Sequence, residues 1–161
     1  MNISEFQERL PEKVEYIVVK DPKMLTILEG QSASFKDLHF SFSKKYIYAL
    51  SQLLSEKNAI QLLVMEDGEF AGYISAAETL RQYKNYIVIT ELFISPDFQG
   101  KGYGKKTVEQ IKIRAQAADL KGMIVQTEFE NIPAQKLYEK QGFQKIINKE
   151  WMEGVTYQYK F

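Results

Sequence analysis

The 161-residue chain contains no cysteine and only one histidine, His39. Without cysteine the protein forms no disulfide, thiolate metal site or iron–sulfur cluster, and a single histidine cannot build a multi-histidine metal site. No apolar run approaches about 18 residues, the length needed to span a membrane. Residues 1–10 include Glu5, Glu8 and Arg9 and lack the apolar segment of a signal peptide. We therefore expect a cytoplasmic protein with no metal and no membrane contact.

The chain also has no excess of charge, because 21 Lys and Arg residues balance 21 Asp and Glu residues. This balance argues against a nucleic-acid partner, since general nucleic-acid binding depends on neutralising phosphates. Hydrophobic residues make up 45% of the chain and charged residues 26%, as in ordinary globular domains. At roughly 150 residues per domain, we expect residues 1–161 to form a single domain.

Short β-branched and aromatic runs predict the strands. They lie at residues 14–19, 60–65, 70–77, 86–95 and 123–127, with two more near 143–149 and 155–161. Asp67-Gly68, between the second and third runs, predicts a hairpin turn because both residues accept a positive φ.

Three regions have a helical pattern. Residues 23–54 predict two helices with a break near residues 35–43. A helix after a glycine-rich turn is predicted to end at Gly122. A further helix begins at Asn131, a good N-cap, and ends at Gly142, which suits the left-handed C′ position. The order of these elements indicates one mixed α/β layer structure.

The glycine-rich turn is the run Gln99-Gly-Lys-Gly102-Tyr-Gly104. It joins a strand to a helix N-terminus, where unpaired backbone N–H groups and the helix dipole favour phosphate. Glycines let the backbone approach the ligand closely. From Gln99 to Lys121 the chain is locally basic, with six basic residues (Lys101, Lys105, Lys106, Lys112, Arg114, Lys121) against two acidic ones (Glu109, Asp119). A plain surface turn that only starts a helix is the alternative.

Two common phosphate-binding motifs do not fit this run. A Walker loop would need glycine at residue 99 and Ser or Thr at residue 106, where the chain has Gln99 and Lys106. A dinucleotide fingerprint would need a third glycine at residue 105, which is lysine, and a repeated βαβ framework.

The run resembles the Q/R-x-x-G-x-G/A pattern of the GNAT superfamily of N-acetyltransferases. A second stretch, Asn131 to Phe143, resembles the family's N-x-x-A-x-x-L-Y-x-x-x-G-F. The resemblance implies a single-domain α/β (α+β) fold with a mixed, mostly antiparallel central sheet of about six to seven strands flanked by about four helices. It also implies acetyl-CoA as co-substrate and a possible homodimer.

The resemblance further implies which residues bind acetyl-CoA, through the backbone at the end of the strand predicted at residues 86–95 and through the glycine-rich turn. These are Leu92, Phe93, Ile94, Gln99, Gly100, Lys101, Gly102, Tyr103, Gly104, Lys105 and Asn131. Asn131 would bind the cofactor, cap its helix, or do both. Tyr138 matches the tyrosine that donates a proton or a hydrogen bond to the coenzyme A thiolate, with a role in core packing as the alternative.

Glu91 is the candidate general base. A carboxylate in an otherwise apolar strand is unusual, and catalysis or binding of the substrate amine would explain it. Alternation places Glu91 and Phe93 on one face of the strand and Leu92 on the other. A structural ion pair is the alternative for Glu91. Glu128 and Glu130 are second candidates. Some relatives carry a glutamate where this chain has Gln126, so that base cannot be transferred, and deprotonation through water stays open.

No motif in the sequence identifies the acceptor substrate. An aromatic-rich stretch (Phe35, Phe40, Phe42, Tyr46, Tyr48) and His39 lie in the region that forms the acceptor cleft in relatives, with core packing as the alternative for the aromatic residues. We expect an N-acetyltransferase acting on a primary amine of a small molecule, such as an aminoglycoside or a polyamine-like compound. A protein N-terminal or lysine acetyltransferase and a non-catalytic acyl-CoA-binding module are the alternatives.

Overall fold

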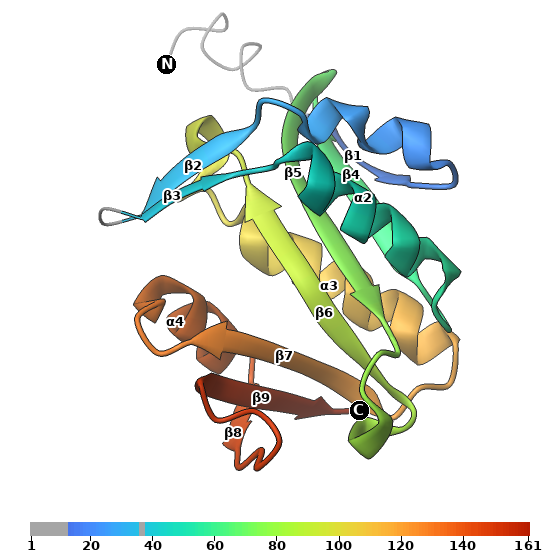
Figure 1. Ribbon diagram of the computed structural model, residues 1–161, viewed down its shortest axis with the longest axis vertical. Helices are drawn as coiled ribbons and strands as arrows, with labels where there is room; N and C mark the ends of the chain where they lie inside the picture. Colours follow the sequence, from blue (N-terminus) through green and yellow to red (C-terminus); the bar gives the residue numbers. More distant parts are fainter. Residues whose placement is uncertain (1–12, 36–37) are drawn as a thin grey trace, which may run out of the picture.

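A seven-stranded sheet organises the protein, whose computed structural model describes residues 13–35 and 38–161 (Figure 1). In spatial order the strands are β1 (Val14–Val18), β4 (Ile60–Glu66), β5 (Glu69–Ala77), β6 (Tyr86–Ile94), β7 (Gly122–Glu128), β9 (Gly154–Lys160) and β8 (Gln144–Ile146). All neighbours are antiparallel except β6 and β7, which are parallel. The predicted mixed, mostly antiparallel sheet is confirmed.

Helices cover both faces of this sheet (Figure 1). The α-helices of the described ranges are α2 (Lys44–Gln52), α3 (Tyr103–Ala117) and α4 (Ile132–Lys140). The 3-10 segments are η1 (Pro22–Leu28), η2 (Leu53–Ser55), η3 (Arg81–Tyr83) and η4 (Pro96–Phe98). One apolar cluster joins α2 and η1 to Leu63 and Phe93, and another joins α3 and α4 to Ile74 and Ile87. None of the described helices is long and apolar enough to cross a membrane.

The prediction of two helices over residues 23–54 is wrong in its first half. The chain forms η1 and then a two-stranded hairpin, β2 (Ser32–Phe35) with β3 (Leu38–Ser41), before α2 begins. Leu25 and Leu28 are fully buried. Their spacing of three matches the three-residue turn of a 3-10 helix as well as an α-helix, so periodicity could not separate the two. Residues 1–10, on which the signal-peptide prediction depends, lie outside the described ranges.

The prediction that Gly122 ends a helix is also wrong. α3 ends at Ala117, and Asp119 turns the chain with a φ of 58°. Gly122 is the first residue of β7, where an added Cβ would lie 2.0 Å from the carbonyl oxygen of Tyr159 and 2.7 Å from the ring of Tyr86. The glycine therefore permits close strand pairing rather than a helix end.

The pairing of β6 with β7 stops half-way along both strands. It runs from Tyr86 opposite Gly122 to Ile89 opposite Val125. The next residue of β6, Thr90, is a bulge against β5, and its hydroxyl donates to the Ser75 carbonyl at 3.1 Å. Because bulges bend a strand, β6 turns away while β7 stays paired with β9 along its whole length (Figure 1). Among the residues that the structure describes, the rest of β6, residues 90–94, therefore has no strand partner on the β7 side.

Candidate active site

The glycine-rich turn lies between the end of β6 and the start of α3. Gly102 is the N-cap of α3 and has a φ of 85°, a left-handed conformation that glycine adopts without strain. A Cβ at Gly100 or Gly102 would meet nothing within 4 Å, so the turn is open on that side. The side-chain amide of Gln99 donates to the Ile94 carbonyl at 3.0 Å and links the turn to β6. The first helical bond runs from Lys106 N–H to the Gly102 carbonyl, and the N–H groups before it suit an anion.

Tyr103, inside the turn, points its side chain into the protein. The ring is buried and meets Phe98 edge-on, with 5.8 Å between the centroids. The hydroxyl donates to the carboxylate of Glu66, a buried residue at the end of β4. Tyr103 is one of the predicted cofactor-binding residues, and only its backbone is available to a ligand. Its side chain anchors the turn to the sheet.

Gly104 has a packing role that the motif does not reveal. An added Cβ would lie 3.3 Å from Leu137 Cδ2, so the missing side chain lets α3 approach α4 closely. The same junction is bridged by Gln141, whose amide donates to the Lys105 carbonyl at 3.0 Å. Gly104 thus serves a different purpose from Gly100 and Gly102, which leave the turn open.

Tyr138 is held in place by the C-terminal cap of α4. Gly142 has a φ of 93°, and its N–H donates to the Glu139 carbonyl at 3.1 Å. The N–H of Phe143 donates to the Tyr138 carbonyl at 3.1 Å, and the two rings pack with centroids 5.5 Å apart. These two bonds and the ring contact form a Schellman motif. The predicted helix end at Gly142 is therefore confirmed, and it positions Tyr138.

The hydroxyl of Tyr138 is buried among apolar groups and is influenced by the negative charge of Glu91. The side chain is 4% exposed, and its ring also packs against Tyr157. Burial raises the pKa of Tyr138 well above its ordinary value, and the negative charge of Glu91 adds to the effect. Within the described ranges, no hydrogen bond engages this hydroxyl. Tyr138 is thus a protonated donor near neutral pH, available to a bound molecule.

Glu91 lies on β6 just after the bulge. Its strand neighbours follow the predicted alternation, because Phe93 packs in the α2 cluster and Leu92 packs against the α3 cluster. The carboxylate accepts a hydrogen bond from the hydroxyl of Tyr46 on α2. No lysine or arginine whose side chain is described forms an ion pair with Glu91, and the side chain of His39 lies outside the described part of the structure.

The environment of Glu91 favours its neutral form more than water does. Burial raises the pKa of Glu91, whereas hydrogen bonds from Tyr46 and from the Leu92 backbone lower it. A carboxylate whose pKa is raised toward neutrality is a better proton acceptor at physiological pH. Glu91 also raises the pKa values of Tyr46, Tyr73 and Tyr138. The charge of one carboxylate therefore acts on tyrosines of three elements, and one of them, Tyr46, is hydrogen-bonded to it.

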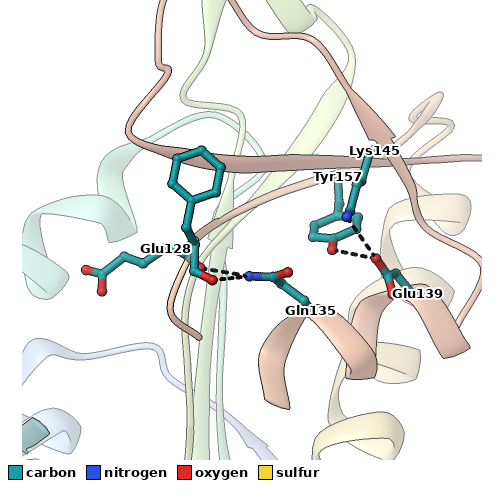
Figure 2. Close-up of polar contacts among 6 residues, drawn as sticks. Glu128, Gln135, Glu139, Lys145 and Tyr157 are labelled. Carbon is teal, nitrogen blue, oxygen red and sulfur yellow. Dashed lines mark hydrogen bonds and ion pairs between the residues drawn. The ribbon is translucent and has the colours of Figure 1, made fainter. Parts of the chain in front are cut away.

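The other predicted carboxylates are in solvent. Glu128 and Glu130 are both exposed after β7. The backbone there is fixed by Gln135, whose amide donates to the carbonyls of Glu128 at 3.1 Å and Phe129 at 2.8 Å (Figure 2). The side chain of Asn131 accepts from Ala134 N–H at 3.2 Å, which confirms its role as a helix cap.

A second polar contact fixes α4 against β9. Glu139 accepts a hydrogen bond from the Tyr157 hydroxyl at 3.0 Å and pairs with Lys145 at 3.5 Å (Figure 2). Burial and this carboxylate raise the pKa of Tyr157 to about 12. The contact holds the helix that carries Tyr138 in register with the sheet.

The aromatic-rich stretch divides between two environments. Phe42 is buried and Tyr46 is half-buried beside Glu91, whereas Tyr48 is 66% exposed. The side chains of Phe35, His39 and Phe40 lie outside the part of the structure that is described. Sequence reasoning named Tyr46 as a lining residue but missed its bond to Glu91, because no pattern links residues 45 positions apart.

Comparison with known proteins shows the family to which this chain belongs. A family model described as the acetyltransferase (GNAT) family matches residues 25–143. The chain is 29% identical over 98 residues to YhfO, an uncharacterized N-acetyltransferase of Bacillus subtilis (strain 168). That match covers 60% of this chain and 66% of the relative, slightly less than two thirds of its length.

Solved structures share the fold at low identity. The ribosomal-protein-S18-alanine N-acetyltransferase of Escherichia coli aligns with a TM-score of 0.67 and 14% identity, over 92% of this chain and 93% of that one. A Bacillus anthracis (strain Ames) protein, named as a streptothricin acetyltransferase and solved in complex with acetyl coenzyme A, aligns with a TM-score of 0.68 and 14% identity, over 92% and 98%. One acts on a protein and the other is named for a small molecule, so the shared fold does not identify an acceptor.

Replacing Glu91 should stabilise the protein in a pH-dependent way. Since burial raises the pKa of Glu91 in the folded state, the stability linked to its proton is present below the unfolded pKa and lost as the pH rises through the folded pKa. Glu91→Gln removes the charge and keeps an acceptor for Tyr46. We expect its free energy of unfolding in urea to exceed that of the wild type by about 0.5–2 kcal/mol at pH 8, with the excess shrinking toward pH 4. Glu128→Gln, an exposed control, should show no such trend, and a constant difference for Glu91→Gln would contradict the argument.

Proposed function

Because this chain belongs to the GNAT family of acetyltransferases, we propose that it transfers the acetyl group of acetyl-CoA to a primary amine of a small molecule while both substrates are bound. The observation that carries the proposal is the divergence of β6 from β7 after Ile89 and Val125. It leaves Glu91 on the strand that diverges, and the charge of Glu91 also acts on Tyr138 of α4. An electrophile bound along β6 would therefore lie near a proton acceptor and a proton donor.

The residues present fit acetyl-CoA at two points. The turn at residues 99–105 combines an open, left-handed Gly102 with the N-terminus of α3 and lysines at 101 and 105, which suits a pyrophosphate. The β7-facing edge of residues 92–94 has no strand partner among the described residues. Apart from the Ile94 carbonyl, which accepts from the Gln99 side chain, its N–H and C=O groups suit the amides of a pantetheine arm. Acetyl-CoA supplies an acetyl group activated as a thioester.

Two side chains would manage the protons. Glu91 would accept a proton from the ammonium of the acceptor, which frees the nitrogen lone pair for attack. Tyr138 would donate a proton or a hydrogen bond to the sulfur that leaves. A thiol pKa of about 8.5 lies below that of a phenol near 10, and burial raises the pKa of Tyr138 further. Hydrogen bonding is therefore the larger part of its contribution.

The preference for a small acceptor rests on the position of Glu91. The carboxylate is half-buried and is bonded to Tyr46 of α2. A small primary amine can reach such a carboxylate without a broad contact surface around it. Cytoplasmic location and assembly as a homodimer remain predictions.

An acceptor screen tests the proposal directly. The protein is incubated with acetyl-CoA and with aminoglycosides, polyamines, peptides with a free N-terminal amine or internal lysine-containing peptides, and free thiol is measured with a chromogenic disulfide. We expect thiol release with small amines at least tenfold above the peptides. Faster release with peptides would favour a protein acetyltransferase. Acetyl-CoA binding by calorimetry with no thiol release above the rate without acceptor would indicate a non-catalytic binding module.

Removing the hydroxyl of Tyr138 should slow turnover without weakening cofactor binding. Tyr138→Phe keeps the ring packing against Phe143 and Tyr157 and loses only the donor. We expect kcat to fall by about 10–100-fold, as for loss of one hydrogen bond to a developing charge, with the calorimetric Kd for acetyl-CoA changed less than twofold. Tyr86→Phe, at the other end of β6, is the control and should retain full activity. An unchanged kcat for Tyr138→Phe would assign Tyr138 to packing alone.

A side chain at Gly102 should block the cofactor turn. Gly102→Val places a branched side chain on the open side of the turn and strains a φ of 85°. The control is Gly30→Val, because Gly30 also has a positive φ (80°) with nothing within 4 Å but belongs to another segment of the chain, between η1 and β2. Both variants should lose similar stability in thermal melts, and only Gly102→Val should raise the Kd for acetyl-CoA, by tenfold or more. Equal affinities would remove the turn from the binding site.

A further inference from the structure

We propose that Tyr46 is a positioning residue that fixes the Glu91 carboxylate for proton removal from the acceptor amine. The inference rests on the proposed function, in which Glu91 is the general base. It adds a residue from a different element, because Tyr46 lies on α2 and Glu91 on β6, 45 positions apart. The bond between the Tyr46 hydroxyl and Glu91 Oε2 carries the inference.

The ring of Tyr46 is held before any substrate arrives. Its backbone N–H donates to the side chain of Ser43, the N-cap of α2, at 3.1 Å. Its ring stacks on Phe42 with centroids 5.9 Å apart. Phe42 in turn meets Phe93, the same-face neighbour of Glu91 on β6, at 5.0 Å. The cap and the rings therefore aim the hydroxyl at the carboxylate, so little entropy remains to be lost when the base acts.

Tyr46 differs from the other polar groups that face Glu91. Tyr73 on β5 already donates to Gln61 at 2.8 Å, and the Tyr138 hydroxyl on α4 makes no hydrogen bond to a described residue. Among the described residues, the Leu92 backbone is the other group that helps to lower the pKa of Glu91. Tyr46 is thus the tyrosine of the three that bonds the carboxylate. Burial and the charge of Glu91 raise the pKa of Tyr46, so it stays protonated while the carboxylate titrates.

This arrangement assigns different tasks to the two carboxylate oxygens. Oε2 accepts from Tyr46, which leaves Oε1 for the ammonium of the acceptor. In the step itself, one N–H bond of the ammonium breaks and an O–H bond forms at Oε1, and the electron pair stays on nitrogen. The hydroxyl proton of Tyr46 does not transfer, because the phenol is far less acidic than the carboxylic acid. Tyr46 acts only by orienting Glu91 and by favouring its ionised form.

The test is the pH dependence of kcat/KM in Tyr46→Phe. The variant keeps the ring on Phe42 and removes the hydrogen bond that lowers the pKa of Glu91. The rate should rise with pH as Glu91 ionises, and the acid limb should move to higher pH in the variant. At a pH below the limb we expect kcat/KM to fall by about tenfold, the effect of one hydrogen bond to a charged group. Tyr48→Phe, an exposed residue on the same helix, should leave the profile unchanged.

A double variant separates failure of the inference from failure of the proposed function. Glu91→Gln should remove the acid limb, and adding Tyr46→Phe to it should change kcat/KM by less than twofold. If Glu91→Gln keeps the limb, Glu91 is not the base and the proposed chemistry fails. If Glu91→Gln removes the limb but Tyr46→Phe leaves it in place, the positioning role is overturned. A further loss of activity in the double variant, with thermal melts matched, would also overturn it, because Tyr46 would then act independently of Glu91.

Discussion

The end of the β6–β7 pairing at Ile89 and Val125 is the constraint on which the rest of the site depends. Two parallel strands that stayed hydrogen-bonded to their ends would leave no backbone groups for a ligand and no room between them. The bulge at Thr90 bends β6 away, and the continuous ladder between β7 and β9 keeps β7 straight. The cost is a set of unpaired backbone groups at an edge, which a protein normally satisfies with a strand or with a ligand.

Around this opening, ordinary helix caps fix the positions of two tyrosine side chains. A Schellman cap at Gly142 and Phe143 fixes Tyr138, and an N-cap at Ser43 fixes Tyr46. Each device is local in sequence and stabilises one helix end by an amount typical of a cap. Because the two helices cover opposite faces of the sheet, the hydroxyls they carry approach Glu91 from different sides. In the proposed site, helix ends rather than loops therefore hold the two hydroxyls.

Local patterns predicted the parts of this protein that depend on local physics. The Asp67-Gly68 turn, the Asn131 cap and the Gly142 cap are each decided by a few adjacent residues, and all three were predictable. The hairpin of β2 and β3 was missed because its alternation is short and lies inside a longer helix-like pattern. Gly122 was assigned to a helix end because its close contact with Tyr159 arises only when β7 and β9 pair. The bond from Tyr46 to Glu91 joins elements that no spacing rule connects.

The inward-facing Tyr103 affects how the kinetic effects of substitutions near this site should be interpreted. Its bond to Glu66 makes the end of β4 a support for the turn that is proposed to bind acetyl-CoA. A substitution at Glu66 touches no substrate, yet it would loosen the turn and weaken affinity. In a kinetic assay such a variant would resemble one altered at the binding surface itself. Residues that never meet the ligand can therefore be mistaken for recognition residues unless folding is measured alongside binding.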